Sequence, residues 1–280
     1  MNRPVSSLLL IAALVSVLAG STWPVLINPG EYARTYAARA MVERGTWEIG
    51  PELRTLGSFE DRARVGDKYY SNKPPGLIWL AVPVVEAVAF VAPGRSHYVD
   101  NYAARVVLSV IPALLAAALL AAWLRRRARS GVVGAGLLLF GTFWGLSATA
   151  FCAHVATGTL VLACAWLLYV EDRLPERMAM LLAGFLGCLC VASEYQSAVV
   201  ITAMFATATV GRWRRIPAIF LGLLGPAMAL GLYNLSCFGK VLTLSNRFDD
   251  LESFGELGQR AAFGMGPRPR RGSSACSSPR

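Results

Sequence analysis

Charge and histidine are both scarce in this sequence. Charged residues make up 16% of the 280 residues, against about 25% in an ordinary soluble domain. The two histidines, His97 and His154, are too few for a histidine-based metal cluster. The six cysteines contain no Cys-x-x-Cys pair, so neither a zinc site nor a disulfide framework is indicated. A glycine-rich phosphate loop and a nucleophile elbow are also missing, so a nucleotide-driven pump and a serine hydrolase lack support.

Long apolar runs are abundant. Hydrophobic residues make up 55% of the chain and the mean hydropathy is +0.48. A transmembrane helix needs roughly 20 mainly apolar residues, because every backbone amide must be bonded within the segment. We therefore predict an all-α integral membrane protein with a bundle of about seven to eight transmembrane helices. The clearest predicted spans are 5–27, 104–124, 132–151, 155–170, 178–192, 195–210 and 216–233. The first is longer than a typical signal-peptide core, which favours a retained helix over a cleaved signal.

Residues 76–92 form an eighth apolar segment, which is interrupted by Pro83 and Glu86. A proline removes an internal hydrogen bond, and a broken helix survives in a membrane only beside protein or water. The segment is either re-entrant and broken at Pro83 or an ordinary kinked span. The sequence leaves both alternatives open.

Basic residues cluster beside the apolar runs, at 125–129 and 212–215, and the net charge is +10. Such clusters are typical of cytoplasmic anchors under the positive-inside rule. They lack the aromatic platforms of a nucleic-acid interface, so we predict no nucleic-acid binding. With these clusters inside, the turns at 151–154 and 193–194 fall on the outer side. The charged loop 28–73 is also outside if the segment 76–92 does not fully cross.

The outer loop begins with a segment at helical spacing. Tyr36, Arg39 and Glu43 recur on one face, and Gly45 is a natural stop. We predict a short amphipathic helix on the membrane surface, with Glu31 in its first turn beside the positive end of the helix dipole. Its charged residues are either a functional group or a solvated face with local ion pairs.

After Gly45 the loop is predicted to be irregular, with charges that alternate in sign between Glu60 and Lys68. It ends in the tetrad Lys73-Pro74-Pro75-Gly76, which follows Tyr69-Tyr70-Ser71-Asn72. The two consecutive prolines after Lys73 restrict the backbone, which limits where its ammonium group points. A fixed cation at the membrane surface suits a lipid phosphate. The alternative is an interfacial aromatic belt with a snorkelling lysine.

Two stretches of the loop resemble the polyprenol-phosphate-dependent glycosyltransferases of the protein mannosyltransferase and aminoarabinose transferase type (glycosyltransferase family 39-like). They are 31–47, which ends in Met-Val-Glu-Arg-Gly-Thr-Trp, and 69–76, Tyr-Tyr-Ser-Asn-Lys-Pro-Pro-Gly. Members of this family have a multispanning GT-C fold and move a sugar from a lipid-phosphate carrier to an acceptor on the non-cytoplasmic side. The resemblance implies a membrane glycosyltransferase of a bacterial inner membrane. Its active site would lie on the outer face, and its partners would be membrane lipids, a lipid-linked sugar donor and an unidentified acceptor.

The family pattern places an Asp-Glu pair at the start of the loop, with the aspartate as the base. Counted back from Met41, these positions are Gly30 and Glu31, so the usual aspartate is missing here. The resemblance implies that Glu31 matches the second acid and would take over as the catalytic base.

The same resemblance makes Arg39 and Lys73 binders of the carrier phosphate, and Arg34 would complete this clamp. Transfer with inversion needs a carboxylate that takes the proton from the acceptor, and cations that stabilise the departing phosphate. Some relatives use a divalent metal. No ligand set is evident in this sequence, so the cofactor stays unknown.

Tyr70 and Glu194 are further candidates for substrate binding. Glu194 lies between two apolar helices, where an ionisable residue is a functional hypothesis, and the alternative is a turn residue that faces water. His154 is interpreted as a structural, capped histidine, since one isolated histidine rarely makes a site.

Two further interpretations concern the class and the extent of the protein. The alternative class is a multispanning transporter or lipid-binding protein without transferase activity, in which Glu86 and Glu194 line a pathway, although no inverted repeat is evident. Residues 1–263 are predicted to form the transmembrane domain, and 264–280, rich in Gly, Pro, Ser and Arg, a disordered basic tail. Relatives usually continue with more helices, so the chain is predicted to be a truncated or degenerate member.

Overall fold

The computed structural model describes residues 28–127 and 129–250. The chain divides into two units, Met1–Asp249 and Asp250–Arg280, and the elements described here belong to the first. The predicted first helix (5–27), the predicted domain end at 263 and the tail 264–280 lie outside the described residues.

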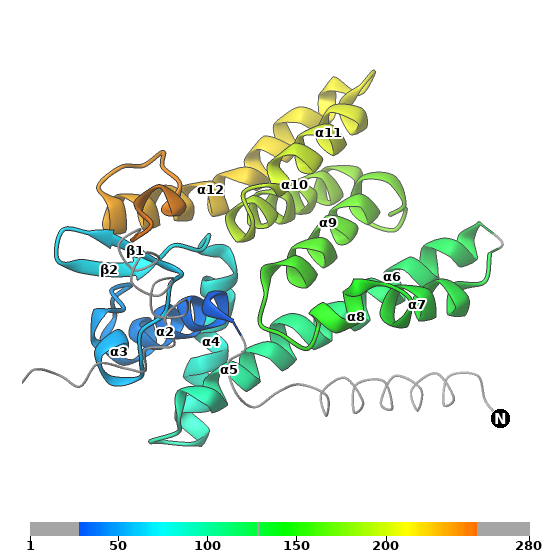
Figure 1. Ribbon diagram of the computed structural model, residues 1–280. Coiled ribbons are helices and arrows are strands. Elements are labelled where there is room, and N and C mark those ends of the chain that lie inside the picture. The colour runs from blue at the N-terminus through cyan, green and yellow to red at the C-terminus, as the bar shows by residue number, and fades with distance from the viewer. Residues whose placement is uncertain (1–27, 128, 251–280) are drawn as a thin grey trace, which may run out of the picture. The chain divides into compact units, whose positions relative to one another are not determined.

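The described part of the chain is mostly helical and contains a two-stranded antiparallel sheet (Figure 1). The α-helices are α2 (Pro29–Arg44), α3 (Gly50–Thr55), α4 (Gly76–Val91), α5 (His97–Arg105), α6 (Ile111–Arg126), α7 (Gly131–Phe140), α8 (Phe143–Ser147), α9 (Ala153–Tyr169), α10 (Glu176–Ser193), α11 (Ser197–Thr209) and α12 (Ile216–Phe238). The strands are β1 (Arg62–Val65) and β2 (Lys68–Ser71), and the shorter helical turns are η1 (Val106–Val110, π-helical), η2 (Trp213–Arg215) and η3 (Ser245–Phe248).

Three helices within the described ranges are long and apolar enough to cross a membrane. They are His97–Arg126, in which α5, η1 and α6 run on as one helix, Glu176–Ser193, and Trp213–Phe238. They cover the predicted spans 104–124, 178–192 and 216–233 and are compatible with an all-α membrane protein. Helices α4, α7, α9 and α11 are apolar but only 10–17 residues long, so the predicted number of seven to eight spans is not confirmed.

The prediction of one continuous span over 132–151 is wrong. Helices α7 and α8 are separated by Gly141 and Thr142, and the Thr142 side chain accepts a hydrogen bond from the N–H of Trp144 (3.1 Å). This bond caps a new helix. Gly145 then packs so closely on α7 that a Cβ there would lie 1.8 Å from the carbonyl oxygen of Leu139. The segment therefore folds back on itself.

Helix α4 is not broken at Pro83, as the re-entrant alternative required. It continues from Gly76 to Val91. Pro83 and Glu86 both lie on its exposed face, so the lost hydrogen bond falls on the side away from the packed residues Ala81 and Val85. Its 16 residues span about 24 Å, less than a hydrocarbon core of about 30 Å.

Helices α10 and α12 pack closely because glycines face each other's backbone. A Cβ on Gly184 would lie 2.1 Å from the carbonyl oxygen of Ile219, and one on Gly222 would lie 2.0 Å from that of Leu181. Small residues at a crossing are what allow two membrane helices to approach this closely. This contact fixes the position of α10, whose C-terminal end lies at the candidate site.

The helix predicted at the start of the outer loop is confirmed as α2, with Gly45 (φ 65°) as its left-handed C-cap. Asn28 caps its N-terminus by accepting a hydrogen bond from the Glu31 N–H (3.0 Å). Its predicted amphipathic character is wrong, because Ala33, Tyr36 and most of the residues around the helix are buried, whereas its place at the membrane surface stays a prediction. Helix α2 packs against α4 and α5 inside the protein.

The loop after Gly45, which the sequence suggested to be irregular, contains the hairpin β1–β2. Arg62 pairs with Ser71 and Val65 with Lys68, so Gly66 and Asp67 form a two-residue turn. An additional bridge joins Ala63 to Asp249. The all-α prediction is therefore incomplete, since this hairpin carries the chain towards the tetrad 73–76.

Candidate functional site

A cavity of about 1020 Å³ opens where five segments distant in sequence converge. They are the first turn of α2, the segment ending in the tetrad 73–76, the region from α8 to the start of α9, the end of α10, and residues 244–246. The positive-inside rule predicts the first four at the same outer level. The titratable residues of the lining are Arg34, Asp61, Lys73, Cys152, His154, Glu194 and Tyr195.

Gly76, the last residue of the tetrad, sets how close two of these segments come. A Cβ at Gly76 would lie 2.6 Å from both the backbone nitrogen and the Oγ of Ser193, and 2.7 Å from the carbonyl carbon of Ala192. Only a glycine permits this approach of α4 to the end of α10. The contact brings Lys73, three residues before Gly76, and Glu194, directly after Ser193, to one cavity.

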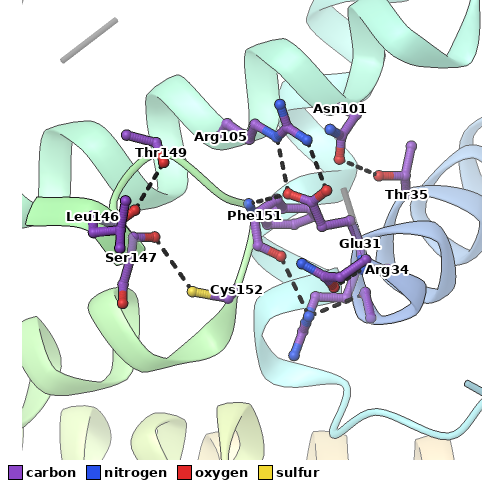
Figure 2. Close-up of polar contacts among 12 residues, drawn as sticks. Glu31, Arg34, Thr35, Asn101, Arg105, Leu146, Ser147, Thr149, Phe151 and Cys152 are labelled. Atoms are coloured by element: carbon purple, nitrogen blue, oxygen red, sulfur yellow. Dashed lines mark hydrogen bonds and ion pairs between the residues drawn. The ribbon is translucent and has the colours of Figure 1, made fainter. Parts of the chain in front are cut away.

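Arg34 is a nearly buried cation in the cavity wall, with 7% of its surface exposed. Its Nη1 donates to the carbonyl oxygens of Gly30 (3.0 Å) and Phe151 (3.3 Å), as Figure 2 shows. Its Nε has no hydrogen-bond partner, and no carboxylate forms an ion pair with Arg34 in the described ranges. Burial lowers the pKa of Arg34, and the negative groups Asp61 and Glu194 act in the opposite direction.

Lys73 lies beside the first turn of α2. Its Nζ forms an ion pair with the Asp61 carboxylate (2.8 Å), and both side chains are about a quarter exposed. A Cβ at Gly30 would lie 3.3 Å from Cε of Lys73 and 3.1 Å from Nη1 of Arg34. Position 30 therefore lies beside both cations of the cavity.

Residues 245–249 tie the tetrad to the end of the described chain. Ser245 Oγ donates to the carbonyl oxygen of Asn72 (2.6 Å), and Asn72 Nδ2 donates to Asp249 Oδ1 (2.9 Å). Tyr195, after α10, reaches the same Ser245 (3.5 Å), and burial raises the pKa of its hydroxyl. These bonds hold the loop 244–246 at the edge of the cavity.

His154 and Glu194 face each other across the cavity lining. His154 Nδ1 lies 2.8 Å from Glu194 Oε1, with 72% of the histidine side chain and 20% of the glutamate side chain exposed. His154 is in the first turn of α9, and Glu194 is the C-cap of α10. The pair thus joins the start of α9 to the end of α10.

Glu31, the predicted base, is not among the residues that line the cavity. Its carboxylate accepts from Arg105 Nε (2.9 Å) and Nη2 (2.7 Å) and from the Phe151 N–H (2.6 Å) (Figure 2). Both side chains of this ion pair are completely buried. The predicted catalytic role of Glu31 stays a prediction, and the arrangement itself is that of a structural ion pair.

Two other predicted residues also lie apart from the cavity lining. Arg39 forms ion pairs with Glu43 and Asp100, each at 2.7 Å. Tyr70 is 8% exposed and packs against Phe238 in a small apolar cluster. Of the six predicted site residues, the structure brings Arg34, Lys73 and Glu194 together in one cavity and leaves Glu31, Arg39 and Tyr70 outside its lining.

Sequence reasoning missed Asp61 and discounted His154. Asp61 belongs to a run of alternating charges, which gave no reason to single it out. The signal for His154 was its place in a short turn on the same side as Glu194, although the two residues are separated by a whole pair of helices. Recognising the pair required knowledge of which helix ends meet.

The described residues contain no group of three or more His, Cys, Asp or Glu side chains placed to hold a metal ion. Comparisons with protein-family models, with curated proteins and with solved structures gave no match. What the structure defines is a mostly helical chain with three apolar helices long enough to span a membrane, and a cavity lined by charged and apolar side chains at the end of one of them.

Proposed function

We propose that the protein is a membrane glycosyltransferase, or a degenerate relative of one, that moves a sugar from a polyprenyl-phosphate carrier to an acceptor hydroxyl. The carrier phosphate binds in the cavity between Arg34 and Lys73. The resemblance of the segments 31–47 and 69–76 to lipid-dependent glycosyltransferases supports this proposal, together with the character of the cavity.

The observation that carries the proposal is that the charge of Arg34 is buried and has no ion-pair partner among the described residues. A buried charge without an opposite charge is costly, and proteins normally pair it. Arg34 lies in the cavity wall with no ion-pair partner in the described part of the chain, and its Nε is unbonded. An anionic ligand would supply the missing charge, and a planar guanidinium binds phosphate oxygens through two parallel bonds.

Lys73 supplies the second cation, and its ion pair with Asp61 fixes the position of its ammonium group. When a phosphate arrives, the ammonium can exchange the carboxylate for phosphate oxygens, since Lys73 is 27% exposed. The wall formed by Phe143 and Leu146 is apolar and exposed, which suits the first isoprene units of a carrier. Together these groups bind the charged head and the apolar chain of one lipid.

The proposed orientation places the cavity on the outer face of a bacterial inner membrane. Helix α10 begins at Glu176, which pairs with Arg215 (2.7 Å) in the basic cluster 212–215, and ends at the cavity. Its 18 residues correspond to about 27 Å. The positive-inside rule assigns the arginine end to the cytoplasm. We also propose that the protein has about seven to eight transmembrane helices.

The rival proposal, a transporter with Glu86 and Glu194 on one pathway, finds less support. Glu194 lines the cavity, whereas Glu86 lies on the exposed face of α4 and is not part of the lining. A pathway would need both carboxylates along one polar route.

Donor turnover tests the proposal. The full chain in liposomes is given undecaprenyl phosphate linked to different hexoses and pentoses, with a sugar-bearing lipid or a serine-containing peptide as acceptor, and release of undecaprenyl phosphate is measured. We expect turnover by the unaltered chain and a loss of at least 100-fold in Arg34→Gln. Arg54→Gln, at an exposed arginine of α3, is the matched control and retains turnover. Failure of every donor would contradict the proposal.

A further inference from the structure

We propose that His154 and Glu194 form the general-base pair of this cavity: His154 takes the proton from the acceptor hydroxyl, and Glu194 orients its imidazole. This inference rests on the proposed glycosyl transfer and adds to it the group that activates the acceptor. It differs from the prediction made from the sequence, in which Glu31 is the base and His154 is structural.

The first argument is the geometry of the pair. Nδ1 of His154 lies 2.8 Å from Oε1 of Glu194, which is hydrogen-bond distance. A carboxylate that accepts from Nδ1–H fixes the tautomer in which Nε2 carries the free lone pair. Because 72% of the histidine side chain is exposed and the residue lines the cavity, Nε2 is accessible to a bound hydroxyl. Glu194, with 20% exposed, is the less accessible partner and acts through the histidine.

The second argument is that the other carboxylates that could act as the base already form ion pairs. Glu31 is completely buried in its two-bond pair with Arg105 and also accepts from the Phe151 N–H. Asp61 lies 2.8 Å from the ammonium of Lys73, the cation that the proposal assigns to the carrier phosphate. A base must reach the proton it abstracts, within a hydrogen bond or through one water. The exposed imidazole of His154 meets this requirement best among these groups.

The proposed step balances in atoms and charge. His154 Nε2 removes the proton of the acceptor hydroxyl while its oxygen forms a bond to the anomeric carbon of the sugar. The bond between that carbon and the phosphate oxygen breaks, and its electron pair stays on the phosphate beside Arg34 and Lys73. The imidazolium that forms is stabilised by Glu194 and then returns its proton to water.

The pair also predicts a pH dependence, because a histidine base must be unprotonated to act. Turnover should therefore rise with pH as the proposed base loses its proton. The charged and titratable groups that share the cavity with His154 are Glu194, Tyr195, Arg34, Asp61, Lys73 and Cys152. Of these, Glu194 is in direct contact with the imidazole.

The test compares His154→Gln and Glu194→Gln with Glu176→Gln. Glu176→Gln is the control. It removes a carboxylate at the other end of α10, which forms an ion pair with Arg215 (2.7 Å). Donor turnover is measured as kcat, KM and pH profile, and binding of undecaprenyl phosphate is measured separately. We expect His154→Gln to lower kcat by about 100-fold or more with unchanged binding of undecaprenyl phosphate. Glu194→Gln should lower kcat by about tenfold and displace the rising limb of the pH profile, because it removes the group that orients the imidazole.

Added imidazole should restore part of the turnover in His154→Gly and leave the turnover of Glu176→Gln unchanged. Turnover in His154→Gln with an unaltered kcat and pH profile would overturn the general-base pair and leave the transferase proposal standing. Absence of both binding and turnover in the unaltered chain would instead contradict the transferase proposal, and the pair with it. The binding measurement therefore separates the two failures.

Discussion

Glu31 and Arg105, 74 residues apart, form an ion pair with two hydrogen bonds in which neither side chain is exposed. The pair joins the first turn of α2 to the end of α5, and a third bond ties the same carboxylate to the Phe151 N–H at the cavity edge. It therefore fixes the position of the helix that carries Arg34.

Glu31→Gln should destabilise the protein strongly. Removing one partner of a buried ion pair costs about 3–5 kcal/mol. The free energy of unfolding, measured in mixed detergent micelles, should fall by about that amount. Glu176→Gln, in a pair whose glutamate is 65% exposed, should cost at most about 1 kcal/mol. A Glu31→Gln protein of normal stability that has lost turnover would contradict the structural role and support Glu31 as the base.

Gly30→Asp should weaken the binding of a phosphate. The new carboxylate would start from a Cβ about 3.1 Å from Arg34 Nη1 and 3.3 Å from Lys73 Cε, and would pair with the cations that the proposal assigns to the ligand. We expect the Kd for undecaprenyl phosphate to rise about tenfold, or about 1.4 kcal/mol. Gly30→Asn has the same shape without the charge and should show a much smaller change. Equal affinities in both variants would show that the two cations do not bind the phosphate.

Gly76→Ala should lower stability and displace Lys73 from the end of α10. The added methyl group would meet the backbone of Ser193 at 2.6 Å, and overpacking of this kind costs about 1–3 kcal/mol. Gly136→Ala in α7 is the matched control, because nothing lies within 4 Å of a Cβ there. Alanine should be neutral or stabilising at that position. Thermal unfolding of both variants in the same detergent measures the difference, and equal melting temperatures would contradict the close approach.

Gly184→Ala should separate α10 from α12. A Cβ at this position would lie 2.1 Å from the carbonyl oxygen of Ile219, and the backbone cannot yield as a flexible side chain would. We expect a loss of about 1–3 kcal/mol in the free energy of unfolding. Gly225→Ala, on α12 with open space around it, should leave stability unchanged. The same loss in both variants would point to a general effect of glycine replacement instead of this helix crossing.

Local sequence signals predicted the parts of the fold that depend on neighbouring residues. The spacing of 29–44 and the glycine after it predicted α2 and its cap, and composition predicted the three long apolar helices. The hairpin was missed although its signal was present. Residues Gly66 and Asp67 form a two-residue turn between strands, but the charges around them suggested an irregular loop.

The site could be predicted only in part, because its geometry depends on contacts between distant segments. The tetrad 73–76 drew attention to Lys73, which lines the cavity, and its Gly76 lies against Ser193 at the end of α10. Nothing near Glu31 in the sequence indicates that Arg105 neutralises it, and nothing near His154 identifies Glu194 as its partner. The sequence did not indicate the burial of α2 either, because the partners of its charged residues Glu31 and Arg39 lie in α5.

The most direct test of the central claim, a lipid-phosphate site between Arg34 and Lys73, is a binding measurement. The protein is titrated in detergent with undecaprenyl phosphate and with undecaprenol, which has the same chain without the phosphate, and bound lipid is counted by native mass spectrometry. We expect the phosphate form to bind much more tightly. We also expect Lys73→Ala to remove most of this preference, and Lys68→Ala, at an exposed lysine of the hairpin, to keep it. Equal binding of the two lipids, or equal effects of the two lysine variants, would contradict phosphate binding between Arg34 and Lys73.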